Sequence, residues 1–173
     1  KLHSSFGSSK GTKKEYVYVW SENALLKALS YNRTSNNLDV ANTISSGVQG
    51  PIGNSGAFLS VSSNGSVDSS AILWASFASS GDANQSVRHG ILHAFAANDV
   101  TKELWNSSFD ANDDLGNYAK FNCPTISNGK VYLATFSNKF LVYGLTGNGI
   151  DTCNSFDIAM NKPAFASSSE NST

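Results

Sequence analysis

Short segments in which apolar and polar residues alternate run along most of the chain, and this period of two is typical of β-strands. The segment EYVYVW at 15–20 is rich in the β-branched and aromatic residues that strands favour. The segment ALLKALSY at 24–31 has a helix-like composition, but it is short and directly follows a strand. Because helices of fewer than about 12 residues have little intrinsic stability, we interpret it as a second strand. The pattern predicts an all-β fold.

Two turns with the same sequence separate neighbouring apolar segments. FLSVSSNG at 58–65 and CPTISNG at 123–129 both end in Ser-Asn-Gly, and each precedes a further apolar segment, AILWASF at 71–77 and KVYLATF at 130–136. An Asn-Gly pair accepts the positive φ angles that tight hairpin turns need. We therefore expect an antiparallel hairpin at each of these turns.

The same order of strands recurs along the chain. The central strands begin at Val17, Ile72 and Val131, so that a unit repeats about every 55 residues. Units of four short antiparallel strands are typical of propeller blades, although a sandwich of two facing sheets also uses such strands. Because one four-stranded sheet cannot bury both its faces alone, we expect a partial β-propeller of about three four-stranded antiparallel blades, part of a longer ring.

Two stretches resemble known families. GILHAFAANDVTKELW at 90–105 and PTISNGKVYLATFSN at 124–138 resemble the C-terminal blades of quinoprotein-like, pyrroloquinoline-quinone-type β-propellers. DIAMNKPAFASSSENST at 157–173 resembles the first strand of a discoidin-like, coagulation-factor type C domain. These resemblances imply propeller blades over 15–147, and a linker with the start of a discoidin-like domain over 148–173. Residues 1–14 are expected to form a flexible leader.

The composition limits the kinds of molecule that the protein is expected to bind and indicates where it is located. The net charge is −1 and the pI is about 6.3, which favours neither nucleic acid nor an acidic membrane surface as a partner. Charged residues make up 14% of the chain, against roughly 25% in ordinary soluble domains. Polar groups come instead from Ser, Asn, Thr and Gly, a composition common among secreted proteins. This composition leads us to expect a secreted or extracellular protein. No apolar run is long enough to span a membrane.

The N-terminal sequence has no Met and no apolar centre of the kind a signal peptide has. Either a leader has been removed or the chain is part of something longer, and the repeat favours the second interpretation. Two cysteines, Cys123 and Cys153, lack a C-x-x-C spacing and a nearby His, which argues against a zinc site. In an oxidising compartment they are candidates for a disulfide; the other interpretation is two unrelated buried thiols.

Asn-x-Ser/Thr sequons, the acceptor pattern for N-glycosylation, occur five times. Short patterns of this kind also arise by chance in Asn- and Ser-rich sequence. The asparagines are Asn32, Asn64, Asn84, Asn106 and Asn171. Asn64 and Asn84 fall in predicted loops, where a glycan would not clash with the core.

The aromatic and acidic residues have structural interpretations beside the chemical ones. The three tryptophans lie inside strand patterns, where packing between blades is favoured over a role as the aromatic floor of a quinone site; they are Trp20, Trp74 and Trp105. An acidic group, FDANDD, contains Asp110, Asp113 and Asp114. It lacks the residue order of an EF-hand loop, so a solvated turn is favoured over a calcium site.

Two histidines, His89 and His93, are four residues apart and would share a face of a strand. A metal pair would need a third ligand, and none is evident. We therefore expect one histidine to cap a loop and the other to pack at a blade edge. No nucleophile elbow and no phosphate-binding loop occurs in the sequence. The sequence accordingly nominates no catalytic, cofactor-binding or metal-binding residue.

Two functions follow as expectations. The favoured one is a non-enzymatic extracellular propeller segment that acts as a structural or binding scaffold, is glycosylated, and adjoins a carbohydrate-binding-type module. Its partners would be the rest of the same propeller or neighbouring subunits, reached through open blade edges, with glycans as a further class. The alternative, implied by the family resemblance, is a fragment of a quinone-dependent sugar or alcohol dehydrogenase. The quinone, the calcium and the catalytic residues would then lie in blades outside this chain.

Overall fold

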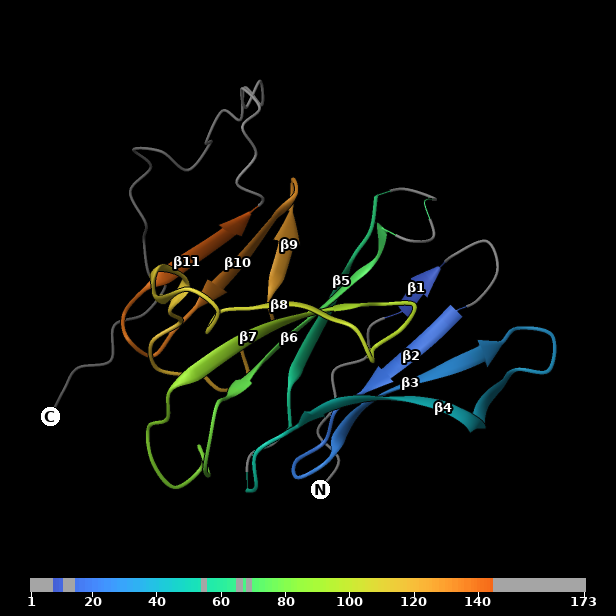
Figure 1. Ribbon diagram of the computed structural model, residues 1–173, viewed down its shortest axis with the longest axis horizontal. Helices are drawn as coiled ribbons and strands as arrows, with labels where there is room; N and C mark the ends of the chain where they lie inside the picture. Colours follow the sequence, from blue (N-terminus) through green and yellow to red (C-terminus); the bar gives the residue numbers. More distant parts are fainter. Residues whose placement is uncertain (1–7, 11–14, 54–55, 65–66, 68–69, 145–173) are drawn as a thin grey trace, which may run out of the picture.

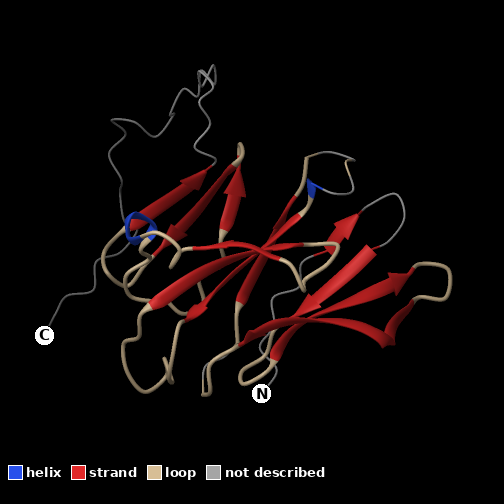
Figure 2. Ribbon diagram, viewed as in Figure 1, coloured by secondary structure: helices blue, strands red, loops and turns tan. Residues whose placement is uncertain are grey.

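The computed structural model describes residues 8–10, 15–53, 56–64, 67 and 70–144. These residues form three antiparallel sheets, which confirms the predicted all-β fold (Figures 1 and 2). A short 3₁₀ turn, η2 (Ala111–Asp113), lies between the second and third sheets in the sequence. Among the described residues, no helix is long and apolar enough to cross a bilayer.

Each sheet is built from strands that are consecutive in the sequence. The first sheet contains β1 (Ser8–Lys10), β2 (Glu15–Val19), β3 (Leu25–Asn32) and β4 (Asn37–Gln49). The second contains β5 (Phe58–Ser62), β6 (Ile72–Ala78), β7 (Gly90–Ala96) and β8 (Glu103–Asn106). The third contains β9 (Thr125–Ser127), β10 (Lys130–Ala134) and β11 (Phe140–Gly144). The first and second sheets have the four strands that were predicted for each unit, whereas the third sheet has three among the described residues.

The segment at 24–31, which composition alone would make helical, is strand β3. Leu26 and Ala28 alternate with exposed Leu25 and Lys27, so that the buried pair faces the core. The predicted hairpin between β9 and β10 turns at Asn128 and Gly129, whose φ angles are 49° and 72°. These two positive angles are what the Asn-Gly pair was expected to supply.

Strand β1 lies within the stretch that was expected to be a flexible leader. Ser8 and Lys10 are the register partners of Val17 and Glu15 on β2. Residues 8–10 thereby supply a fourth strand to the first sheet and occupy the edge of β2. An edge strand left open would present a row of unpaired N–H and C=O groups.

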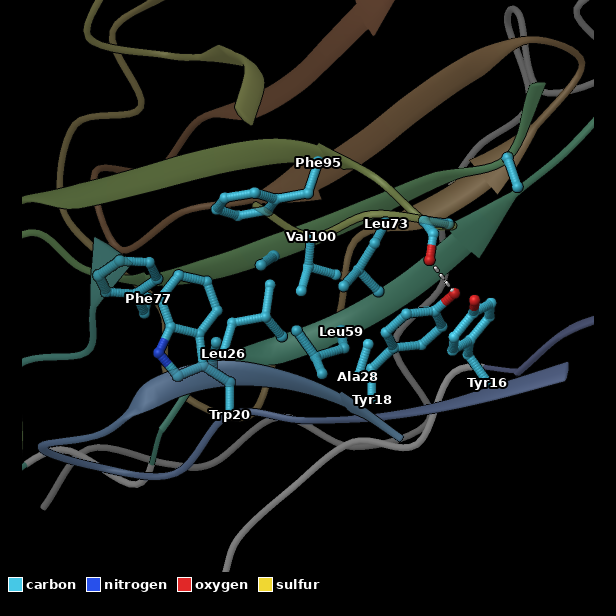
Figure 3. Close-up of a cluster of buried hydrophobic side chains, with 14 residues drawn as sticks. Tyr16, Tyr18, Trp20, Leu26, Ala28, Leu59, Leu73, Phe77, Phe95 and Val100 are labelled. Carbon is cyan, nitrogen blue, oxygen red and sulfur yellow. Dashed lines mark hydrogen bonds between the residues drawn. The ribbon is translucent and has the colours of Figure 1, made fainter. Parts of the chain in front are cut away.

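The second sheet lies between the other two and packs on both its faces (Figure 1). On one face, Tyr18 of β2 and Trp20, which directly follows β2, pack against Leu73, Phe77 and other apolar side chains of the second sheet (Figure 3). The hydroxyl of Tyr18 also donates to the backbone oxygen of Ala97, at 2.6 Å (Figure 3). The first and second sheets thus share one apolar core.

The opposite face of the second sheet packs against the third. Leu92 of β7 is fully buried in a cluster with Leu115 of the connecting segment and with Val131 and Leu133 of β10. The first strands of the three sheets lie next to one another, since β5 contacts β1 on one side and β9 on the other. Three sheets stacked in this way differ from the two-sheet sandwich considered above.

The tryptophans are part of this packing between sheets. Trp20 belongs to the core of the first and second sheets. Trp74 and Trp105 lie edge to face, with ring centroids 6.4 Å apart, and Trp105 also contacts Tyr143 of β11 at 5.4 Å. The expectation that all three pack between neighbouring sheets is confirmed.

Candidate functional site

The third sheet has one covered face and one open face, because its residues alternate. Val131 and Leu133 point into the core, whereas Tyr132 between them lies on the other side with Phe140 and Val142 of β11. Phe140, the first residue of β11, pairs in register with Ala134 at the end of β10 and is 68% exposed. The rings of Phe140 and Tyr132 stack on each other with centroids 6.0 Å apart. We call Tyr132, Phe140 and Val142 the open apolar face of the third sheet.

Small polar and cationic side chains border this open apolar face. Thr125 and Ser127 on β9 are exposed and pair in register with Tyr132 and Lys130 on β10. A surface of this composition can bury apolar area, at roughly 25 cal/mol per Å² removed from water. The neighbouring hydroxyl and ammonium groups can pair with polar groups at the rim of a partner. The face is therefore suited to packing against another protein surface.

The first sheet carries apolar residues on its outer side as well. Val17 and Val19 alternate with the buried Tyr16 and Tyr18 on β2 and are partly exposed. On the adjacent β3, Leu29 is the register partner of Val17 and is also partly exposed. A strand that is apolar on both sides is typical of a sheet covered on both faces. The two end sheets of the stack thus both present apolar side chains outward.

A polar network lies inside the core between the first and second sheets. His93 of β7 is 4% exposed, and its Nδ1 is 2.5 Å from Oε1 of Glu103 on β8. The side-chain nitrogen of Asn106 donates to the same carboxylate oxygen at 2.8 Å. Cross-strand register brings these residues together, since His93 pairs with Asn106. The expectation that a histidine packs at a blade edge is wrong for His93, because β7 is an interior strand covered by the first sheet.

Aromatic rings enclose the imidazole of His93. Phe77 stacks on it with centroids 4.8 Å apart and an interplanar angle of 3°, and Phe95 stacks at 5.7 Å. Trp20 of the first sheet lies against it at 5.9 Å. Burial lowers the pKa of His93, and Glu103 acts in the opposite direction. The sequence signal for this site is weak: a lone His inside the apolar run GILHAFA indicates burial but does not identify its partners.

His89 lies in a separate environment. It is exposed before β7, and its Nε2 is 2.7 Å from Oδ1 of Asp114. Its backbone oxygen accepts from the N–H of Ser79, which closes the preceding loop. The two histidines therefore bind different carboxylates and do not form a metal pair. Throughout the portion of the chain that the structure describes, no three His, Cys, Asp or Glu residues gather in a metal-binding group.

The acidic group at 110–114 forms a capped turn. The carboxylate of Asp110 accepts from the N–H of Asn112 and begins η2. The backbone N–H of Gly116, and then His89, lower the pKa of Asp114. The hydroxyl of Tyr143 donates to the backbone oxygen of Asp113 at 3.0 Å. Burial, together with the carboxylates of Asp113 and Asp114, raises the pKa of Tyr143 to about 12. This turn fastens β11 to the segment that precedes the third sheet.

The cysteine and glycosylation expectations are only partly within the described ranges. Cys123 is exposed, two residues before β9 begins, whereas Cys153 lies outside the described residues, so the disulfide stays a prediction. Asn171 also lies outside them. Asn32, Asn64 and Asn84 are exposed. Asn106 is 6% exposed, and its amide nitrogen, the atom that would carry a glycan, donates to Glu103.

Because Asn106 is buried and the other described sequon asparagines are exposed, glycosylation should differ between them. We expect the chain, when secreted from eukaryotic cells, to carry glycans at Asn32, Asn64 or Asn84 and to leave Asn106 unmodified. The physical reason is that a glycan on Asn106 would occupy the core between two sheets and remove a hydrogen bond. Enzymatic deglycosylation in H₂¹⁸O followed by peptide mass mapping would mark each modified asparagine. A marked Asn106 in folded, secreted protein would contradict the described packing of β8.

Comparison with protein-family models, with curated proteins and with solved structures gave no match to this chain in any of the three.

Proposed function

We propose that this chain is a segment of a non-enzymatic extracellular β-propeller that acts as a structural or binding scaffold, next to a discoidin-like, carbohydrate-binding-type module. Its sheets would be blades of a longer ring, and its partners further sheets of the same propeller or of neighbouring subunits. The single observation that carries the proposal is the open apolar face of the third sheet, at the end of a stack in which the second sheet is covered on both sides.

The geometry of the stack supports this function in a second way. Blades of a propeller surround an axis, and the first strand of each blade lies nearest that axis. Here β5 contacts both β1 and β9, which are the first strands of the adjacent sheets. The outer side of the first sheet carries Val17, Val19 and Leu29. A further blade would pack against this side, just as another blade would pack against the open apolar face of the third sheet. No observation among the described residues favours the dehydrogenase alternative, so we carry forward the scaffold alone.

The open apolar face can be tested by replacing its two most exposed members. We expect the double variant Phe140→Ser/Val142→Ser to reduce binding of the dye ANS by roughly half, because one of two open apolar faces of the stack is removed. The variant should also self-associate less than the unaltered chain, as measured by light scattering after size-exclusion chromatography. Both residues lie on the solvent side of β11, so the cores should be preserved.

A matched control separates this face from general surface hydrophobicity. Phe109 is 66% exposed, close to the value for Phe140, but lies in the loop after β8. Phe109→Ser should leave dye binding and self-association nearly unchanged. Equal effects of the two changes, with near-UV circular dichroism unaltered, would show that the face has no special role. The scaffold proposal would then lose its main support.

A further inference from the structure

The surroundings of His93 leave one of its nitrogens without a partner. Nδ1 faces the Glu103 carboxylate at 2.5 Å, so in the neutral ring Nδ1 carries the proton and donates it. Nε2 then carries a lone pair, and no hydrogen-bond donor reaches it from any described residue. A buried polar atom without a partner is uncommon in folded proteins and requires a physical explanation.

The elements packed around the ring supply a single charge. β6 contributes Phe77, the residue after β2 contributes Trp20, and β7 itself contributes Phe95, all of which are uncharged. Glu103 on β8 is the charged side chain in contact with the ring. Lys102, beside Glu103 in sequence, is exposed and pairs with Asp99 at 3.2 Å. A proton added at Nε2 would thus create a buried N–H that has no acceptor within the described structure.

The position of the ring connects its charge to the packing of two sheets. His93 and Phe77 belong to the second sheet, and Trp20 covers them from the first. Water can hydrate a protonated Nε2 only if this aromatic packing loosens. We propose that His93 is an acid-responsive switch, in which protonation of Nε2 weakens the packing of the first sheet on the second.

The sign of the effect follows from where the proton binds. The unfolded chain binds a proton at His93 near the ordinary pKa of about 6.5, whereas the folded chain binds it at lower pH. The folded state is therefore fully stabilised above pH 6.5 and loses stability as the pH falls from there to the folded-state pKa. Within that window, the unfolding equilibrium constant is expected to rise by up to about tenfold per pH unit.

The test is denaturant unfolding of the whole chain at a series of pH values between about 7.5 and 5.0, above the range where most carboxylates titrate. The unaltered chain should keep its stability down to about pH 6.5 and lose it as the pH falls further. His93→Phe keeps a flat ring between Phe77 and Phe95 but cannot be protonated, and it should remove the pH dependence. His89→Gln alters the exposed histidine that pairs with Asp114. This variant should retain the pH dependence of the unaltered chain. A His93→Phe chain with the full pH dependence would overturn the proposal.

Two further measurements locate the effect and guard against a variant that fails to fold. In a Trp74→Phe/Trp105→Phe background, Trp20 is the remaining tryptophan. Its emission should shift to longer wavelength as the pH falls, because water reaches the loosened interface. Nuclear magnetic resonance of the unaltered chain should show the His93 ring titrating below pH 6.5. Titration at or above 6.5, or a constant Trp20 emission, would overturn the switch without any His93 variant.

Discussion

Replacing Trp20 with alanine is expected to lower the free energy of unfolding by about 3–5 kcal/mol, the range for truncating a large aromatic side chain in a core. Trp20 is fully buried and lies 4.7 Å from Phe77 and 5.7 Å from Phe95, measured between ring centroids. Its Nε1 also donates to the backbone oxygen of Ala24 at 2.9 Å. The change therefore removes the main aromatic contact between the first and second sheets. Denaturant unfolding followed by circular dichroism would measure the loss.

The control for this change is an exposed aromatic residue. Phe136 is exposed after β10 and is not a member of either large core cluster. Phe136→Ala should change stability by less than about 0.5 kcal/mol, as surface substitutions usually do. If the two substitutions cost the same, Trp20 would not hold the first sheet against the second in the way described.

Leu92→Ala is the second large effect, with an expected loss of about 2–5 kcal/mol. Leu92 is fully buried on the face of the second sheet that lies away from Trp20. It packs there with Leu115, Val131 and Leu133. Its removal leaves a cavity between the second and third sheets, which close packing cannot easily fill. Thermal or denaturant unfolding of the variant would measure the cost.

A leucine on the neighbouring strand provides the matched comparison. Leu104 of β8 is exposed, so Leu104→Ala removes the same atoms without creating a cavity. It should cost less than about 0.5 kcal/mol. A large loss at Leu104, or a negligible one at Leu92, would mean that the third sheet does not pack on the second through this cluster.

Much of this fold could be predicted because its signals are local. The alternation of Leu26 and Ala28 with Leu25 and Lys27 assigns β3 as a strand, and the Asn128–Gly129 pair supplies the hairpin angles. The recurrence of the strand order predicted about three successive units, and the described residues form three successive sheets. A local pattern also indicated that the tryptophans pack between sheets, since each lies within a strand pattern; Trp20 is fully buried, and Trp74 and Trp105 are partly buried.

The polar network could not be predicted because it depends on which residues face each other across strands. His93, Glu103 and Asn106 come together through the β7–β8 register, which shifts between Ala94 and Phe95. Strand β1 could not be predicted for a similar reason. Its sequence, SSK, has no apolar alternation, and it forms a strand by pairing with the edge of β2. The sequon at Asn106 also looks usable from the sequence alone. The fold buries its side chain, which a local pattern does not reveal.

The position of the second sheet between two cores has a consequence for biosynthesis. A chain made from its N-terminus completes the first core once Val100 has emerged, because that cluster uses the first two sheets and residues up to Val100. Leu92 and Trp74 then stay uncovered until Val131 and Leu133 follow. During that interval the nascent chain exposes a broad apolar sheet surface, which makes it a target for chaperones and prone to aggregation. A pause in translation between Val100 and Val131 would lengthen this vulnerable period.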